Sequence, residues 1–252
     1  MVSQSPVCSV LLLTEDSAGD AFKTLHAVTK ELLKLVDEHV QTHRIRFEPL
    51  LDAQALQAVH GNIWKSRSGK DHHKQVSLVR YMATKLMESG FVLFHIDGDR
   101  TWAERSSSEN VQKFETSLRK QVEQLVSGAL QKKGQPGVLS GTMARLCLLV
   151  PFYSLESWLY QNTRKGRELC EANHRAEHLD TFAEWEVDRA LLDEVAEPKE
   201  SCCLADRHNA TLAEAYPARE VYAVGKSFTH AVESLKGCED LRRALAKTYL
   251  AA

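Results

Sequence analysis

The chain has 252 residues, of which 43% are hydrophobic and 26% are charged, as in an ordinary globular protein. Its formal net charge of −2 excludes a polycation that coats nucleic acid along its whole length. No apolar run reaches the ~18 residues of a membrane span, and the N-terminal segment lacks the basic start of a secretory signal. Six scattered cysteines favour reduced thiols, so we expect a cytoplasmic protein.

The first third of the chain alternates between strand-like and helix-like segments. Residues 7–14 form a short apolar run typical of a buried strand. Residues 20–40 carry apolar side chains at helical spacing, and "RIRFEPLL" at 44–51 alternates as a second strand does. After a polar, basic loop, residues 76–86 predict a helix that ends near Gly90.

The middle of the chain repeats this order. Residues 91–96 are nearly all apolar and predict a third strand, 111–129 predict a long amphipathic helix, and 144–152 predict a fourth strand. The alternation indicates an α/β fold with a four-stranded, mostly parallel sheet flanked by helices. Beyond the fourth strand the sequence becomes polar, acidic and helix-prone. We therefore expect an α/β catalytic domain over 1–160 and a helical C-terminal extension over 161–252 that packs on it.

Acidic side chains follow three of the predicted strands. Glu15 and Asp16 follow the first strand, Asp97 and Asp99 follow the third, and Glu156 lies a turn beyond the fourth. Because the carboxyl ends of parallel strands open on one edge of a sheet, these carboxylates should converge there. Crowded like charges cost stability unless a cation neutralises them. An oxygen-only ligand set suits Mg²⁺ or Mn²⁺.

The predicted metal site has a primary and a secondary ligand set. We expect Glu15, Asp97 and Asp99 to bind one divalent ion that polarises a phosphoryl oxygen of the substrate. Asp20 and Glu156 are the candidate ligands of a second ion. Capping of the helix that begins near residue 21 is the alternative role for Asp20.

A segment rich in lysine and arginine lies between the second and third predicted strands. Its candidates for contact with a DNA or RNA backbone are Lys65, Arg67, Lys70 and Lys74. Such contacts would give salt-sensitive binding with little sequence preference. A solvated loop and helix face is the alternative.

The order of these acids resembles the TOPRIM domain of topoisomerases, primases and OLD-family nucleases. The matching residues are Glu15 after the first strand and the pair Asp97 and Asp99 after the third. The segments "VPFYSLESWLYQN" and "YAVGKSFTH" resemble parts of small OLD-like TOPRIM nucleases of prokaryotic defence systems. The resemblance implies metal-dependent hydrolysis of phosphodiesters in nucleic acid, with Lys226 near the phosphate. It also implies an anti-phage effector that works beside a separate ATPase subunit, and a homo-oligomer is a further partner considered for the chain. TOPRIM domains usually carry glycine directly after the glutamate, whereas Asp16 stands there in this chain.

The segment "FVLFHIDGDRT" also resembles the haloacid-dehalogenase pattern. In a phosphatase of that kind Asp97 would be the nucleophile and Asp99 a general acid. The family needs a second, later acidic pair, for which Glu239 and Asp240 are the candidates, and it does not explain Glu15. A non-catalytic TOPRIM module that acts through an ATPase partner is the third interpretation.

Overall fold

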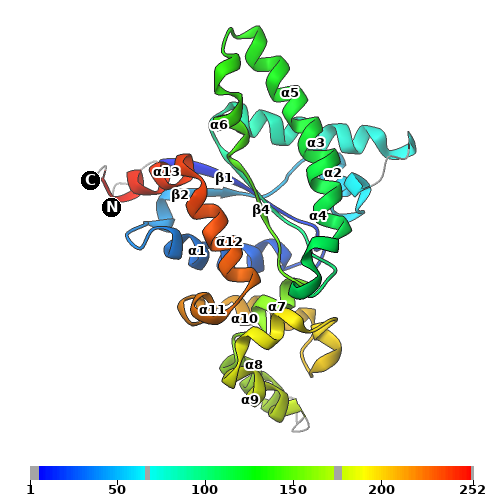
Figure 1. The fold of residues 1–252 in the computed structure, drawn as a ribbon, viewed down its shortest axis with the longest axis vertical. Coiled ribbons are helices and arrows are strands. Elements are labelled where there is room, and N and C mark those ends of the chain that lie inside the picture. Colours follow the sequence, from blue (N-terminus) through cyan, green and yellow to red (C-terminus); the bar gives the residue numbers. More distant parts are fainter. Residues whose placement is uncertain (1–5, 66–68, 173–177, 251–252) are drawn as a thin grey trace.

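The computed structural model describes residues 6–65, 69–172 and 178–250. Its centre is one sheet of four parallel strands in the order β2-β1-β3-β4 (Figure 1). The strands are β1 (Cys8–Thr14), β2 (Ile45–Glu48), β3 (Phe91–His95) and β4 (Leu146–Leu149). This topology confirms the predicted α/β fold with a parallel sheet flanked by helices.

The two central strands, β1 and β3, are buried on both faces. Every residue of β3 is buried, and along β1 Val10 and Leu12 pack into one core while Leu11 and Leu13 pack into another. Side chains alternate between the faces of a strand, so a strand covered on both sides needs apolar residues at every position. This requirement explains the continuous apolar runs in the sequence.

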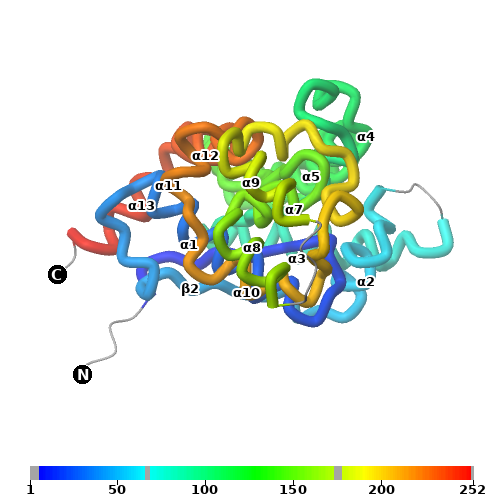
Figure 2. Tube along the Cα trace, turned by 90° about the horizontal axis from the view of Figure 1, so that it is seen from below, coloured from blue at the N-terminus to red at the C-terminus, as the bar shows by residue number. Residues whose placement is uncertain are grey.

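Helices from both halves of the chain cover one face of the sheet. The core on this face joins α1 to the C-terminal helices, which Figures 1 and 2 show on the side of α1, away from α2. The helices that contribute to this core are α1 (Ala21–Val36), α7 (Leu155–Leu159), α8 (Thr163–Ala172), α9 (Leu179–Val187), α10 (Asn209–Ala213), α11 (Ala218–Val224), α12 (Ser227–Gly237) and α13 (Glu239–Leu250).

The opposite face is covered by helices from the middle of the chain, with Trp64, Phe94 and Phe114 packed edge to face at the centre of that core. A π-helical stretch over Phe114–Leu118 joins two of these helices into one long segment, where the sequence predicts a long amphipathic helix. The helices of this group are α2 (Ala53–His60), α3 (His72–Met87), α4 (Glu109–Lys113), α5 (Arg119–Lys132) and α6 (Leu139–Met143).

Two contacts between distant segments hold the C-terminal region, one to the sheet edge and one within the region itself. The Arg44 guanidinium, just before β2, donates to the carbonyl oxygen of Thr248 in α13 at 2.7 Å. Cys170 of α8 and Cys203 form a disulfide with a Cα–Cα distance of 5.9 Å, so the expectation of reduced thiols was wrong for these two residues. Among the residues that the structure describes, no helix has the length and apolar character to cross a membrane.

Candidate functional site

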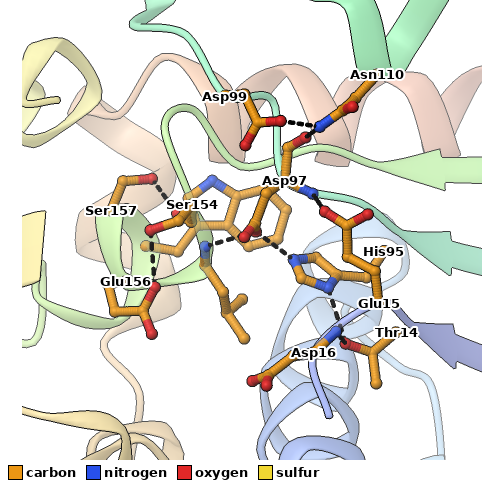
Figure 3. A network of polar contacts seen from close by, with 12 residues as sticks. Thr14, Glu15, Asp16, His95, Asp97, Asp99, Asn110, Ser154, Glu156 and Ser157 are labelled. Carbon is orange, nitrogen blue, oxygen red and sulfur yellow. Dashed lines mark hydrogen bonds and ion pairs between the residues drawn. The ribbon is translucent and has the colours of Figure 1, made fainter. Parts of the chain in front are cut away.

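The carboxylates predicted to converge lie around one pocket at the carboxyl edge of the sheet (Figure 3). The pocket has a volume of about 260 Å³. Glu15, Asp97, Asp99 and Glu156 all line it. The other lining residues are Asp16, Asn62, Lys65, His95, Leu155 and Lys199. Residues as far apart in the chain as Glu15 and Lys199 therefore share one small volume.

The ladder between β1 and β3 places Glu15 directly beside Asp97. Thr14 lies opposite His95 in the register of the two strands, and the Glu15 N–H donates to the His95 carbonyl oxygen at 3.3 Å. The Glu15 side chain then turns back, and its Oε1 accepts the Asp97 N–H at 2.6 Å. Glu15, directly after β1, thus fixes the backbone position of Asp97, which lies just beyond β3.

A buried histidine and a helix end hold the Asp97 carboxylate. Asp97 Oδ1 accepts the N–H of Leu155, the first residue of α7, at 3.1 Å, and it lies 3.3 Å from His95 Nε2. His95 Nδ1 lies 3.0 Å from Thr14 Oγ1. Burial lowers the pKa of His95, but the contact with Asp97 and the charges of Asp97 and Glu15 outweigh it and raise that pKa above its ordinary value. His95, held by Thr14, therefore fixes the orientation of the Asp97 carboxylate from the buried side of the pocket.

Asp99 lies at the exposed mouth of the pocket in a left-handed backbone conformation. Its φ is 50°, and its N–H donates to the carbonyl oxygen of Tyr153 at 3.0 Å. Asn110 of α4 donates both to the Asp99 carboxylate and to the Asp97 carbonyl oxygen at 2.9 Å. Asn110 thereby fixes the spacing of the two aspartates.

Gly98, between the two aspartates, passes directly beneath the ring of Phe152. A Cβ atom on Gly98 would lie 2.5 Å from Phe152 Cδ1, which is far inside van der Waals contact. The Gly98 N–H donates to the Pro151 carbonyl oxygen at 3.0 Å, so the backbone cannot move away without losing this bond. The glycine is required for the close approach of the β3 and β4 loops.

We expect Gly98→Ala to lower the free energy of unfolding by about 1–3 kcal/mol, the usual cost of overpacking. Gly128→Ala in α5 is the matched control, because no atom lies within 4 Å of its added Cβ. That change should raise the free energy of unfolding by about 0.5–1 kcal/mol through helix propensity. Urea unfolding of both variants measures the difference. Equal effects of the two substitutions would contradict the steric account.

Glu156 points into the pocket and is held by groups from the C-terminal region. The residue is 3% exposed. Its carboxylate accepts from Ser154 Oγ at 2.7 Å and from Asn209 Nδ2 at 2.8 Å, and Lys199 Nζ lies 3.1 Å from Oε1. Lys199 and Asn209 reach the site from beyond the predicted catalytic domain.

Lys65 lies inside the pocket and pairs with Glu15. Its Nζ is 3.0 Å from Glu15 Oε2. Burial and the neighbouring Asp97 charge raise the pKa of Glu15 above its ordinary value, although Lys65 opposes them. Burial also raises the pKa of Asp99, with Lys65 opposing and Asp97 adding to the shift. Lys65 therefore does not fully offset the cost of holding Glu15 and Asp99 in their charged forms.

The donor set of the pocket fits a hard divalent cation. Five carboxylates face two lysines, and the buried Glu15 Oε2 atom has only the Lys65 ammonium, at 3.0 Å, to offset its charge. Such an oxygen-rich, negatively charged set is what Mg²⁺ and Mn²⁺ select. Across residues 6–65, 69–172 and 178–250, no three His, Cys, Asp or Glu side chains are already grouped as an ion would need. Lys65 takes up the place beside Glu15 that a cation would fill.

Two residues predicted for the site do not line the pocket. Asp20 is exposed at the start of α1, and its side chain does not cap the helix, because the loop that follows Glu15 turns away from the sheet edge before it reaches Asp20. Lys226 directs its ammonium group to Glu194 at 2.7 Å, and its backbone N–H donates to Asp193 at 2.9 Å. The expected roles of Asp20 as a metal ligand and Lys226 as a phosphate contact gain no support from these positions.

Lys70 and Lys74, two further basic candidates, lie outside the pocket. Lys70 is exposed in a short turn over Gly69–Asp71, and Lys74 pairs with Asp71 at 2.8 Å. Arg67 lies outside the described residues. Of the predicted backbone contacts, Lys65 alone is placed among the pocket residues that the structure describes.

A second, more apolar hollow adjoins the acidic pocket. Its volume is about 270 Å³, and Asp16 lines both. Phe22, Leu50, Val59 and His60 are among the side chains around it. An apolar hollow and the acidic pocket thus lie next to each other at this edge of the sheet.

Three residues of the site were missed by the sequence analysis, namely His95, Asn110 and Lys199. A weak signal exists for His95, because it is the single polar residue in the apolar run "FVLFHI". Asn110 and Lys199 lie in polar segments without any distinguishing pattern. Their roles depend on tertiary contacts.

Comparison of the sequence with protein families, with curated proteins and with solved structures finds no match in any of the three. The sheet order and the pocket define the class of the protein, an α/β protein with an acidic pocket at the carboxyl edge of a parallel sheet. Its chemistry must be argued from the pocket residues themselves.

Proposed function

We propose that this chain is a nuclease that hydrolyses phosphodiester bonds in DNA or RNA with Mg²⁺ or Mn²⁺, in the manner of a TOPRIM enzyme. One observation carries the proposal. Glu15 from β1 is hydrogen-bonded to the backbone of Asp97 beyond β3, and both side chains line one pocket with Asp99 and Glu156. This is the arrangement in which acids from separate strands can share a cation.

Glu15, Asp97 and Asp99 would hold the ion, and Glu156 is the nearest candidate for a second one. A bound divalent ion supplies Lewis-acid polarisation of a phosphoryl oxygen and offsets its negative charge. The protein contributes the orientation of these carboxylates. His95 and the Leu155 N–H fix Asp97, and Asn110 fixes Asp99.

The two lysines of the pocket supply the contacts to the substrate. Lys65 and Lys199 now pair with Glu15 and Glu156. If a divalent ion offset the charge of the carboxylates, the two ammonium groups would be free to contact phosphate oxygens of the substrate. There they would stabilise the negative charge that develops during hydrolysis. His95 is fully buried, so it positions Asp97 and does not exchange protons with a substrate.

The surroundings of the pocket suit a polynucleotide. The adjoining apolar hollow, with Phe22 and His60 on its wall, offers a seat for the base of a nucleotide next to the scissile phosphate, since aromatic groups stack on any base. The exposed Lys70 can contact the backbone farther along. DNA and RNA both satisfy these contacts.

The defence role and the ATPase partner of the proposal rest on the resemblance to OLD-like TOPRIM nucleases. A non-catalytic module that acts through the ATPase would use the same surfaces. Co-purification with the product of a neighbouring ATPase gene would support the partnership. A chain that always elutes alone would contradict it.

A haloacid-dehalogenase-like phosphatase with Asp97 as nucleophile is less well supported. The acidic pair that it needs, Glu239 and Asp240, lies in α13, where Asp240 pairs with Arg145 and Arg243. Neither acid lines the pocket. That mechanism also leaves Glu15 without a role.

We expect cleavage of plasmid DNA, single-stranded DNA or tRNA in Mg²⁺ or Mn²⁺, and its loss in EDTA, because the carboxylates repel a phosphate unless a cation screens them. Readdition of Mg²⁺ should restore it. Gel assays of the three substrates measure the activity. Phosphate release from small monoesters without cleavage of any polynucleotide would contradict the proposal and favour the phosphatase.

We expect Asn110→Ala to reduce cleavage by about 10–100-fold, the range found when a group that orients a metal ligand is removed. The change frees Asp99 without altering the charge of the pocket. Gln112→Ala is the matched control, since Gln112 is exposed on the same helix and bonds to Ser106. Steady-state rates at saturating Mg²⁺ measure the effect. A rate equal to that of the control would show that Asn110 has no positioning role.

A further inference from the structure

Two free cysteines, Cys147 and Cys238, lie next to β4 in a pocket distinct from the acidic pocket. Cys147 belongs to β4, and Cys238 connects α12 to α13. Cys147 Sγ lies 3.5 Å from the Ala144 carbonyl oxygen, and Cys238 Sγ lies 3.3 Å from the same oxygen. Both thiols therefore donate to one carbonyl oxygen, and the two sulfur atoms cannot be farther apart than the sum of these distances.

The thiols line a pocket through which a small molecule can reach them. This pocket has a volume of about 410 Å³. Arg119 and His230 are among its polar side chains, and Phe152 separates it from the loop of the acidic site. The residues themselves are 8% and 6% exposed, so bulky reagents are excluded.

The surroundings of the two sulfurs are unequal. The neighbouring Cys147, together with the N–H groups of Leu241 and Asp240 at the start of α13, lowers the pKa of Cys238 to about 7. The neighbouring Cys238 and burial raise the pKa of Cys147 well above its ordinary value. At neutral pH Cys238 therefore carries a larger thiolate fraction than an ordinary cysteine, whereas Cys147 stays a thiol. Thiolates are the reactive form of cysteine.

We propose that Cys147 and Cys238 form a redox-active dithiol that a hydroperoxide closes to a reversible disulfide. The Cys238 thiolate attacks one peroxide oxygen, the O–O bond breaks and hydroxide leaves, which gives a sulfenic acid on Cys238. The Cys147 sulfur then attacks the Cys238 sulfur, the S–O bond breaks, and the thiol proton leaves with the oxygen as water. Two thiols lose two electrons in total, and hydrogen peroxide is reduced to two waters.

The disulfide would join two parts of the chain that act on the acidic pocket. β4 leads into the loop whose Pro151 and Tyr153 carbonyl oxygens hold Gly98 and Asp99. Cys238 ends the helix that begins at Ser227. The bond would tie this helix to the strand, so the oxidation state of the pair sets how firmly the C-terminal helices hold the β4 edge. This inference does not depend on the proposed nuclease activity.

The other cysteines serve as internal controls. Cys170 and Cys203 are already bonded to each other. Burial raises the pKa of Cys8 and of Cys202 to about 11, so both are thiols at neutral pH. We expect hydrogen peroxide to oxidise the pair at least ~10-fold faster than Cys8 or Cys202, because the thiolate is the nucleophile.

The test treats the full-length chain with hydrogen peroxide and follows free thiols and linked peptides by mass spectrometry. The expected result is loss of two of the four free thiols, a peptide that links residues 147 and 238, and recovery with dithiothreitol. Cys147→Ser should instead accumulate a sulfenic acid on Cys238 that dimedone traps. Cys238→Ser should leave Cys147 unoxidised, and Cys202→Ser should behave as the natural chain does.

Failure to find the 147–238 peptide while the protein remains folded by circular dichroism would overturn the proposal. Oxidation of Cys8 or Cys202 before Cys238 would also overturn it. Because the peptide is sought in the unaltered chain, instability of a serine variant does not affect this outcome.

Discussion

Replacing Glu15 by Gln, or Asp97 by Asn, is expected to reduce metal-dependent cleavage on the order of 10³-fold, the scale of loss when a main electrostatic group is removed from a site. Glu15→Gln keeps an oxygen that can accept the Asp97 N–H at 2.6 Å, so the local backbone is preserved while the negative charge is lost. Rates with saturating Mg²⁺ and plasmid DNA measure the effect, and circular dichroism checks the fold.

Asp20→Asn is the matched control for these variants. It removes a carboxylate from the same loop as Glu15, but Asp20 is exposed and does not line the pocket. We expect its cleavage rate to stay within about twofold of that of the natural chain, as for surface substitutions away from special features. Equal losses in Asp20→Asn and Glu15→Gln would show that general charge, and not this pocket, controls the activity.

Replacing Trp158 by Ala is expected to lower the free energy of unfolding by about 3–5 kcal/mol, the range for a buried tryptophan. The side chain is fully buried in α7, with its ring 5.3 Å from that of Phe228. Its indole N–H donates to Ser227 Oγ at 2.7 Å, and its carbonyl oxygen accepts from the Tyr216 hydroxyl at 3.0 Å. The residue therefore links the acidic loop to the C-terminal helices.

Trp158→Phe separates the packing of the ring from its hydrogen bond. Phenylalanine retains most of the apolar volume but leaves Ser227 without its donor, which should cost about 1–3 kcal/mol. Urea unfolding curves of both variants give the two values. A loss below ~1 kcal/mol for Trp158→Ala would mean that the C-terminal helices do not depend on this core.

Much of the sheet can be predicted from the sequence because a strand buried on both faces needs apolar residues at nearly every position, which few other elements show. The run ending at Thr14 and the run ending at His95 are apolar at nearly every position, and the structure pairs these two residues. Once both strands are parallel and adjacent, Glu15 and Asp97 must emerge at the same edge. Their proximity follows from topology, without any knowledge of side-chain contacts.

The rest of the site depends on contacts that no local pattern encodes. Glu156 receives Asn209 and Lys199 from segments that fold back over α7, and nothing near these residues marks them. Asp20 shows the limit of the topological argument, since five residues of loop after Glu15 are enough to place it in solvent, outside the pocket. The disulfide between Cys170 and Cys203 likewise requires two distant segments to meet.

Binding of Mn²⁺, followed by electron paramagnetic resonance, tests most directly whether acids from β1 and β3 share one cation. The account predicts that Glu15→Gln and Asp97→Asn each weaken Mn²⁺ binding by at least ~10-fold, because each loses a charged oxygen ligand. Asp20→Asn should bind as the natural chain does. Unchanged Mn²⁺ affinity in both Glu15→Gln and Asp97→Asn would contradict the account.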